Sequence, residues 1–251
     1  MVRVPWSAST IREGFQDPAD HPCLAGLTPL WSEIAEEARA ALGRLDFLRY
    51  RFPQIYDSDR PGVEGRRAMF YLYVLGARVE RNCALAPKTA AALESFPGLA
   101  TAAFYVLGPQ TRILPHCGVP QDRMLRAHLG LVCPPECYLR IANEKQSWSD
   151  GNWMVFDDRL EHEAWNASDE TRCVLSLDFM PFPSEGDGAM LKQLRMAMLQ
   201  AKPTEAPWYL AAGLEIDPEL RPEMDERWEA LLPRRRRGLE SLIETNGLFF
   251  T

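Results

Sequence analysis

Hydrophobic and polar positions give the first part of the chain a mixed, partly helical pattern. In residues 29–45, "PLWSEIAEEARAALGRL", apolar residues recur at steps of three and four. This spacing predicts an amphipathic helix whose apolar stripe covers a core. Residues 69–76, "MFYLYVLG", are aromatic and branched and predict a strand. Residues 87–96, "PKTAAALESF", predict a second helix with Pro87 in its first turn.

The middle region, residues 101–183, has a different pattern. Its short β-prone runs include "AAFYVL", "LRAHLGLV", "CYLRIA", "NWMVF" and "RCVLSLDF", and turn sequences such as "GPQ", "CPPE" and "SDGN" separate them. Several short strands with almost no helical periodicity predict an all-β sandwich or barrel, for which a jelly roll is one natural solution. We therefore expect a mainly β protein with flanking helices.

Two of these runs have one apolar and one polar face. Alternate residues of a strand point to opposite sides. In the first run the polar face carries Arg126, His128 and Gly130, and the other face carries Leu125, Leu129 and Leu131. In the second run the polar face carries Arg172, Val174, Ser176 and Asp178, opposite Cys173, Leu175, Leu177 and Phe179. A polar face of this kind lies either in solvent or in a wet cavity.

The last region, residues 184–251, is helical in pattern again. "GAMLKQLRMAMLQA" and "ERWEALLPRRRRGLESLI" are amphipathic, and Pro233 interrupts the second. We expect one domain over residues 1–251, with an N-terminal cover of helix and strand (1–100), a jelly-roll core (101–183) and a C-terminal helical extension (184–251). The extension could serve dimerisation or close over substrate, so a monomer and a homodimer are both expected states.

Composition narrows the class of protein. The 251 residues are 46% hydrophobic and 25% charged, as in an ordinary soluble globular protein. No apolar run approaches the ~20 residues that span a bilayer, and the first residues lack the apolar core of a signal peptide. Six cysteines are too sparse for a disulfide scaffold. We therefore expect a cytoplasmic protein that does not act at a membrane.

Charge and cysteine spacing argue against two further classes. The net charge of −7 argues against a nucleic-acid partner, and acidic helical sequence flanks "PRRRRG" at 233–238, which predicts a solvated basic face. Cys133 and Cys137 of "CPPEC" have no second Cys or His pair at zinc-finger spacing. Neither nucleic acid nor structural zinc is expected.

The candidate chemistry gathers around three of the four histidines. His116 and His128 lie in one stretch and His162 in another. Together the three could form a three-histidine metal centre. Two imidazoles from different strands, with other positions left open, suit an Fe(II) that must also bind substrate and O₂. For any one histidine alone, a core or surface hydrogen bond is the simpler explanation. Arg172 follows His162 by ten residues, and its planar fork suits the distal carboxylate of a dicarboxylate cosubstrate.

Ordered matches over residues 85–180 identify a family resemblance. They are "PHCG", "LRAHLGLVCPPECYLRIANE", "FDDRLEHEAWN" and Arg172, with weaker support from "PKT" at 87–89. The chain resembles the aspartyl/asparaginyl β-hydroxylases, oxygenases that depend on Fe(II) and 2-oxoglutarate and have a double-stranded β-helix (jelly-roll) core. The resemblance implies that His116 and His162 bind iron and that Arg172 binds the distal carboxylate of 2-oxoglutarate. His128 and Arg126 would contact the cosubstrate, with substrate as an alternative partner of Arg126.

The chain also departs from common patterns. Most iron oxygenases of this broad class have an Asp two residues after the first His, where this chain has Gly118; the resembled family works with two histidines and water. Cys117 replaces a usual threonine. Tyr105 stands where the family tends to have a serine that helps hold the cosubstrate, so its hydroxyl would bind from further away or the pocket is reshaped. Asp157 and Asp158 could be ligands, but turn formation before His162 is favoured.

The resemblance implies a reaction but not a substrate. We expect hydroxylation of an unactivated C–H bond in a free or carrier-bound amino acid or related small metabolite, in a natural-product pathway. The substrate carboxylate would lie against Arg126 or Arg140. Oxidative cyclisation, desaturation or halogenation at the same iron is the first alternative. A non-catalytic jelly-roll binding protein is the second.

Overall fold

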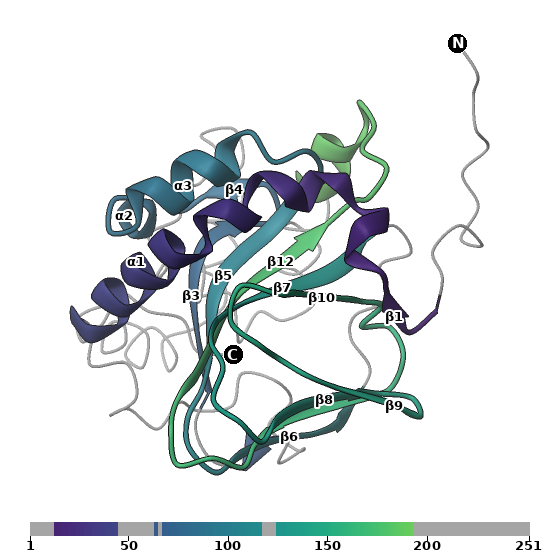
Figure 1. Cartoon of the computed structure of the whole chain (residues 1–251). Helices are drawn as coiled ribbons and strands as arrows, with labels where there is room; N and C mark the ends of the chain where they lie inside the picture. Colours follow the sequence, from purple (N-terminus) through teal and green to yellow (C-terminus); the bar gives the residue numbers. More distant parts are fainter. Residues whose placement is uncertain (1–12, 45–62, 65–66, 117–123, 193–251) are drawn as a thin grey trace, which may run out of the picture.

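The chain folds into three layers: helices, a seven-stranded sheet and a five-stranded sheet (Figure 1). The computed structural model describes residues 13–44, 63–64, 67–116 and 124–192. Helices α1 (Trp31–Arg44) and α3 (Pro87–Glu94) lie over the outer face of the larger sheet, and the smaller sheet faces its inner side. The mainly β, jelly-roll class predicted from the sequence is confirmed.

All strand pairs in both sheets are antiparallel. In order across the sheet, the larger one consists of β1 (Phe15–Gln16), β10 (Trp153–Phe156), β7 (Leu125–Val132), β12 (Arg172–Phe179), β5 (Leu99–Leu107), β3 (Arg67–Val74) and β4 (Ala77–Arg78). The smaller one consists of β2 (Val63–Glu64), β6 (Thr111–His116), β11 (His162–Asn166), β8 (Cys137–Ile141) and β9 (Glu144–Ser147). Short helices complete the described chain: η2 (Pro18–Asp20), η3 (Pro22–Gly26), η4 (Thr28–Leu30) and α2 (Glu80–Cys83).

One hydrophobic core lies between the helices and the larger sheet. The apolar stripe predicted for the first helix is buried in it, as is the predicted apolar face of β7 and β12. Glu37 of α1 accepts hydrogen bonds from the backbone N–H groups of Lys88 and Thr89, both at 2.8 Å. These are among the first N–H groups of α3, which have no partner within the helix, so Glu37 also joins the two helices. Both predicted helices are confirmed.

A second core lies between the two sheets. Leu107, Phe156 and Val174 enter it from the larger sheet, while Ile113, Leu139 and Ile141 enter it from the smaller one. The polar face predicted for β7 and β12 therefore points into the sandwich and not into solvent. His128 and Arg172 are carried into the interior by strand alternation alone.

The structure changes two details of the predicted strands. The run at 69–76 ends as a strand at Val74, because Leu75 (φ 45°) and Gly76 (φ 81°) turn the chain back into β4. Strand β9 was not predicted, since all four of its residues are exposed at the sheet edge and show no apolar alternation.

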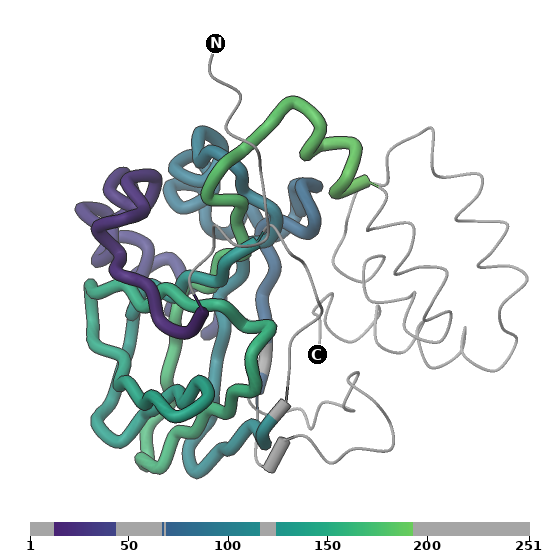
Figure 2. Tube along the Cα trace, turned by 90° about the vertical axis from the view of Figure 1, so that its right-hand side faces the viewer, coloured from purple at the N-terminus to yellow at the C-terminus, as the bar shows by residue number. Residues whose placement is uncertain are grey.

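Residues 181–192 run beyond the end of β12 across the top of the molecule (Figure 2). Residues 187–192 are helical, in agreement with the start of the predicted C-terminal helical region, and the remainder of that region lies outside the described residues. In the part of the chain that the structure describes, no helix is both long and apolar enough to span a bilayer.

Candidate functional site

The two candidate iron ligands lie at one end of the smaller sheet. His116 is the last residue of β6 and His162 the first of β11, and the antiparallel register pairs them directly. Directly opposed residues have Cβ atoms about 4.5–5.5 Å apart. Residues 117–123, which include Cys117 and Gly118, lie outside the described residues.

The His162 ring is buried and oriented by a backbone group. Its Nδ1 donates to the carbonyl oxygen of Leu160 at 2.9 Å, and the ring lies 6.4 Å from that of Phe156. Because a carbonyl can only accept, Nδ1 carries the proton and Nε2 of the neutral ring carries the lone pair. A ring held in this way is prepared to ligate a metal through Nε2.

Asp157 builds the turn that precedes His162. Its Oδ1 accepts from the backbone N–H of Arg159 at 3.1 Å and from Nε of the same residue at 2.8 Å, and its Oδ2 accepts from Nη2 at 2.7 Å. Both carboxylate oxygens are therefore engaged in the turn, and the side chain is buried. The geometry agrees with turn formation and gives no support to Asp157 as a ligand.

Asp158, the next residue, ties the same turn to Arg126. Arg126 Nη1 lies 3.0 Å from Asp158, and Arg126 Nε donates to Oδ1 of Asp178 at 2.7 Å. Arg126 shares the inner face of β7 with His128, as the strand counting predicted. In this structure its guanidinium is paired with two carboxylates, so a role toward cosubstrate or substrate stays a prediction.

His128 and Arg172 carry buried nitrogen atoms for which the described residues supply no hydrogen-bond partner. The two residues are 3% and 1% exposed, and His128 Nε2, Arg172 Nε and Arg172 Nη1 have no hydrogen-bond partner among the described residues. A buried donor without an acceptor costs about 1–3 kcal/mol, and more when it is charged. Burial lowers the pKa of Arg172 and holds the pKa of His128 well below its ordinary value, with the nearby Arg172 adding to the effect on His128.

The unsatisfied N–H groups of His128 and Arg172 fit the carboxylate of a cosubstrate. A buried guanidinium with N–H groups that are unsatisfied among the described residues suits a carboxylate acceptor, and a neutral imidazole donating through Nε2 can add a further bond. No carboxylate of the described chain occupies that position. The residues present therefore fit a bound carboxylate, on an observation independent of the resemblance.

Tyr105 lies beside both donors. The Arg172 guanidinium lies 5.1 Å from the Tyr105 ring, and the His128 ring lies 6.1 Å from it in an edge-on arrangement. Its hydroxyl accepts from Nη1 of Arg67 at 3.4 Å. The structure thus brings Tyr105 to the site, while direct contact of its hydroxyl with the cosubstrate stays a prediction.

Trp148 was not predicted from the sequence, yet it contacts both His128 and Arg172. Its indole Nε1 donates to His128 Nδ1 at 3.3 Å, and its ring lies 4.4 Å from the Arg172 guanidinium. Trp148 follows the exposed strand β9 in the polar stretch "KQSWSDGN". An isolated tryptophan in a polar stretch was the one sign that this side chain could be buried. The stretch has no apolar periodicity that would have predicted the burial.

The thiols near Arg172 are protonated, and those of Cys137 and Cys173 are buried. Burial raises the pKa of Cys133 to about 12 and that of Cys173 to about 12. Cys137 donates its S–H to Oδ1 of Asn166. These thiols are therefore uncharged neighbours of Arg172. They are not prepared to act as nucleophiles or metal ligands, because a cysteine must lose its proton for either role.

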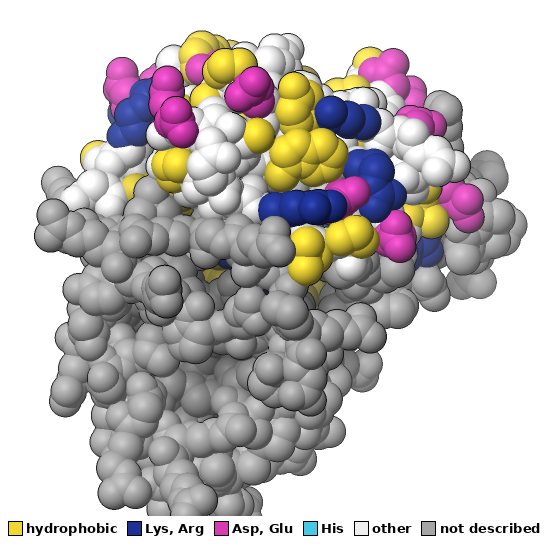
Figure 3. Space-filling view, turned by 90° about the horizontal axis from the view of Figure 1, so that it is seen from below, with side chains coloured by type: hydrophobic (Ala, Val, Ile, Leu, Met, Phe, Trp, Pro, Cys, Tyr) yellow, Lys and Arg dark blue, Asp and Glu magenta, His cyan; other side chains and the backbone are white. Residues whose placement is uncertain are grey.

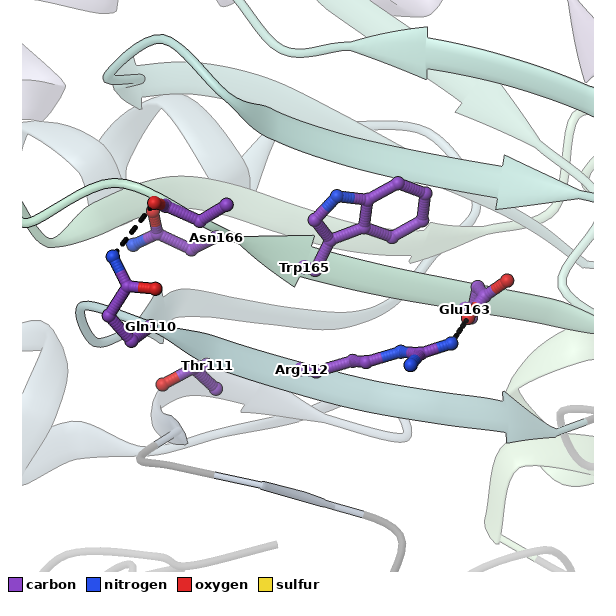
Figure 4. A pocket seen from close by; sticks show the side chains of 7 residues that line it. Gln110, Thr111, Arg112, Glu163, Trp165 and Asn166 are labelled. Carbon is purple, nitrogen blue, oxygen red and sulfur yellow. Dashed lines mark hydrogen bonds and ion pairs between the residues drawn. The ribbon is translucent and has the colours of Figure 1, made fainter.

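A separate open pocket of about 370 Å³ lies on the outer face of the smaller sheet (Figure 4). Glu163 and Trp165 line it, and they alternate along β11 with the inward residues His162 and Ala164. Its other lining residues are Gln110, Thr111, Arg112, Asn166 and Ala167. None of the candidate site residues lines this pocket.

Arg140 belongs to the same outer face. Its neighbours Leu139 and Ile141 point into the core between the sheets, and Arg140 Nε donates to Glu163 at 2.6 Å. Hydrogen bonds from Arg112 and Arg140 lower the pKa of Glu163, although burial acts in the opposite direction. Seen from below, the described surface mixes Lys or Arg, acidic and hydrophobic side chains (Figure 3). Arg140 thus faces away from the interior of the sandwich, and its expected contact with substrate stays a prediction.

Comparison with known proteins identifies the family. Residues 29–181 match the family model described as aspartyl/asparaginyl beta-hydroxylase. An ornithine lipid ester-linked acyl 2-hydroxylase from Rhizobium tropici is 40% identical over 167 residues, which are 65% of this chain and 59% of that protein. The human aspartyl/asparaginyl beta-hydroxylase is 38% identical over 154 residues, which are 59% of this chain and 20% of that protein. The matches thus span less than two thirds of either relative.

The solved structures that resemble this chain do so only weakly. A prolyl hydroxylase from Trichoplax adhaerens, in complex with a hypoxia-inducible-factor peptide, has a TM-score of 0.43 at 13% identity and covers 64% of this chain and 81% of that one. A Pseudomonas putida prolyl-4-hydroxylase has a TM-score of 0.37 at 16% identity and covers 61% and 86%. The assignment rests on the family model, which matches more than half of the 251 residues. The chain therefore belongs to the aspartyl/asparaginyl β-hydroxylase family of enzymes.

Proposed function

We propose that the chain hydroxylates an unactivated C–H bond of an amino acid or related small metabolite, with Fe(II), 2-oxoglutarate and O₂. The observation that carries the proposal is the group of donors on His128 and Arg172 that have no partner within the described residues, in the interior of the sandwich that also holds His162. An anion with a carboxylate is the ligand that would satisfy them. The family of the chain supplies the same expectation independently.

The residues divide into metal ligands and cosubstrate ligands. His116 and His162 would hold iron, which when bound supplies the centre at which 2-oxoglutarate and O₂ react. His162 would use Nε2 for this, because its Nδ1 is engaged by the carbonyl oxygen of Leu160. Arg172 would bind the distal carboxylate of the cosubstrate in a two-point contact. His128 is kept neutral by burial and would donate its Nε2–H to the same ligand.

The surrounding side chains would exclude water and fix orientation. The rings of Tyr105, Trp148 and Phe156 pack around His128 at centroid distances of 6.1, 5.9 and 5.0 Å. Such an apolar lining strengthens hydrogen bonds to a carboxylate, because little water competes for them. Arg126 is within reach of the turn that carries His162, through Asp158, and would face substrate if its pairing with Asp178 rearranges.

The identity of the substrate is proposed on chemistry alone. The names of the relatives describe two different substrates, the acyl chain of an ornithine lipid and aspartyl or asparaginyl groups. We retain a small carboxylate-bearing metabolite, free or carrier-bound, in a cytoplasmic natural-product pathway. The proposed assembly is a monomer or homodimer, without a nucleic acid or membrane partner.

The test is coupled turnover. Protein loaded anaerobically with Fe(II) and 2-oxoglutarate is exposed to O₂ with panels of amino acids and acyl-carrier conjugates, and succinate and product mass are measured. Substrate-dependent succinate with a product heavier by one oxygen is expected. Loss of two hydrogens would indicate cyclisation or desaturation, and exchange of hydrogen for halogen would indicate halogenation. His162→Ala is the inactive control. If no panel member yields succinate while 2-oxoglutarate still binds, a binding protein is the better account.

A further inference from the structure

Trp148 sits on a loop that is docked tightly against β7. The backbone N–H of Gly130 donates to Asn152 at 3.0 Å, and the N–H of Gly151 donates back to Gly130 at 2.9 Å. Oδ1 of Asp150 accepts from the backbone N–H of Cys133 at 2.7 Å. The loop between β9 and β10 is therefore fixed to the strand that carries His128.

Close docking of this loop requires the glycine at position 130. A Cβ added there would lie 2.0 Å from the carbonyl oxygen of Ser149, the residue after Trp148. Real Cβ atoms do not approach a backbone oxygen so closely, so any side chain would push the loop away. Gly130 thus sets the position of the Trp148 ring inside the sandwich.

The indole N–H determines which nitrogen of His128 carries the proton. Trp Nε1–H can only donate, and it donates to His128 Nδ1 at 3.3 Å. A neutral imidazole whose Nδ1 accepts must carry its proton on Nε2. His128 Nε2 is the buried atom without a partner among the described residues, so it is an N–H donor and has no lone pair for a metal. This physical reason separates His128 from the two iron ligands.

The same ring supports Arg172. The guanidinium lies 4.4 Å from the Trp148 ring, within the range of a cation–π contact. The ring of Trp148 is also nearly parallel to that of His128, at an interplanar angle of 29°. One side chain therefore contacts both residues that carry the unpartnered donors.

We propose that Trp148 is a positioning residue of the cosubstrate site, which holds His128 in the Nε2–H tautomer and aligns Arg172 so that both donate to one bound 2-oxo dicarboxylate. This inference rests on the proposed function. Trp148 itself need not touch the cosubstrate. Without its N–H, His128 can place the proton on either nitrogen, and part of the population presents a lone pair toward the ligand carboxylate.

The test combines a tautomer measurement with a binding measurement on the full chain. Protein with ¹⁵N-labelled histidine is loaded with Zn(II), a diamagnetic replacement for Fe(II), and long-range ¹H–¹⁵N spectra report the proton on each ring. With only four histidines, the spectrum is simple to assign. Calorimetry of 2-oxoglutarate binding to the same Zn(II)-loaded protein gives the dissociation constant.

Trp148→Phe removes the N–H and retains a ring, and Trp153→Phe is the matched control. Trp153 also donates its indole N–H, to Thr28 Oγ1 at 2.9 Å, but on the helix side of the sheet. In the parent protein we expect His128 to have its proton on Nε2. Trp148→Phe should mix the two tautomers and weaken 2-oxoglutarate binding about three- to tenfold, as for loss of one hydrogen bond. Trp153→Phe should change neither.

Each contrary outcome has a distinct meaning. If the parent protein shows the proton on His128 Nδ1, the inference is overturned before any variant is made. If Trp148→Phe leaves tautomer and affinity unchanged, or weakens binding without any change of tautomer, Trp148 does not position His128. If the parent protein fails to bind 2-oxoglutarate at all, both the inference and the proposed function are overturned.

Discussion

His162 lies directly opposite His116 in the antiparallel pair of β11 and β6, and the ladder becomes irregular immediately after His162. The pair belongs to the smaller sheet, whereas His128 belongs to β7 of the larger sheet. The end of β6 and the start of β11 thus bring two histidines from distant parts of the sequence to one end of the smaller sheet. His128 faces the interior of the sandwich from the larger sheet.

His162→Ala and His116→Ala should each abolish metal binding, because two ligands are the whole protein contribution proposed for the iron. His128→Ala should keep the metal and lose affinity for 2-oxoglutarate, since its role is donation to the cosubstrate. Electron paramagnetic resonance of bound Mn(II), used as a probe of the site, measures the first effect. Metal affinity that depends equally on all three histidines would show a three-histidine centre instead.

Strand alternation predicted much of this site because its period is fixed. Counting in twos placed His128 and Arg172 on the polar faces of their strands, and both faces are turned inward. Leu129 and Leu175, which lie on the opposite, apolar faces of the same strands, pack in the core on the helix side, as expected. The register between His116 and His162 could not be counted from the sequence, because it depends on which strands pair.

The sequence pattern did not predict which loop side chains enter the interior. Trp148 stands in a polar stretch, and its burial follows from the docking of its loop on Gly130, which is a long-range contact. Arg140 shows the reverse case. It matched the resembled pattern, yet its place between the inward residues Leu139 and Ile141 turns it to the outer face.

Gly130→Ala should destabilise the protein, because the new methyl group would lie 2.0 Å from the Ser149 carbonyl oxygen. We expect a loss of about 1–3 kcal/mol in the free energy of unfolding, measured by urea denaturation. Gly26→Ala is the matched control, since nothing lies within 4 Å of its added Cβ. Equal stability of Gly130→Ala and Gly26→Ala would show that the Trp148 loop moves away without cost.

Arg172→Met should stabilise the ligand-free protein. The side chain is 1% exposed and carries two N–H groups without partners among the described residues, so an apolar chain of similar length removes an uncompensated cost. Replacement of buried charges by apolar groups can add about 1–4 kcal/mol. Thermal unfolding in the absence of 2-oxoglutarate measures the effect. A clearly lower melting temperature would mean that Arg172 is satisfied within the protein and does not await a ligand.

Stability should fall as the pH drops below about 6.5, in part through His21. Burial lowers the pKa of His21, against opposing effects of Asp20 and Asp17, and its ring packs edge-on against Phe179 at 5.7 Å. The unfolded state then binds a proton that the native state does not, so acid favours unfolding by at most about 1.4 kcal/mol per pH unit. His21→Leu should reduce the difference in unfolding free energy between pH 7.5 and 5.5. An unchanged difference in the variant would assign the pH dependence to other groups.

The most direct test of the account is calorimetric titration of Mn(II)-loaded protein with 2-oxoglutarate, in the parent chain and in Arg172→Met. We expect one binding event in the parent chain and a loss of at least about 100-fold in affinity in the variant, as for a charged two-point contact worth about 3 kcal/mol. Binding of succinate in the parent, more weakly, would agree with recognition of the distal carboxylate. Equal affinity of the parent chain and the variant for 2-oxoglutarate would contradict the account, because the buried donors of Arg172 would then have no role in holding the cosubstrate.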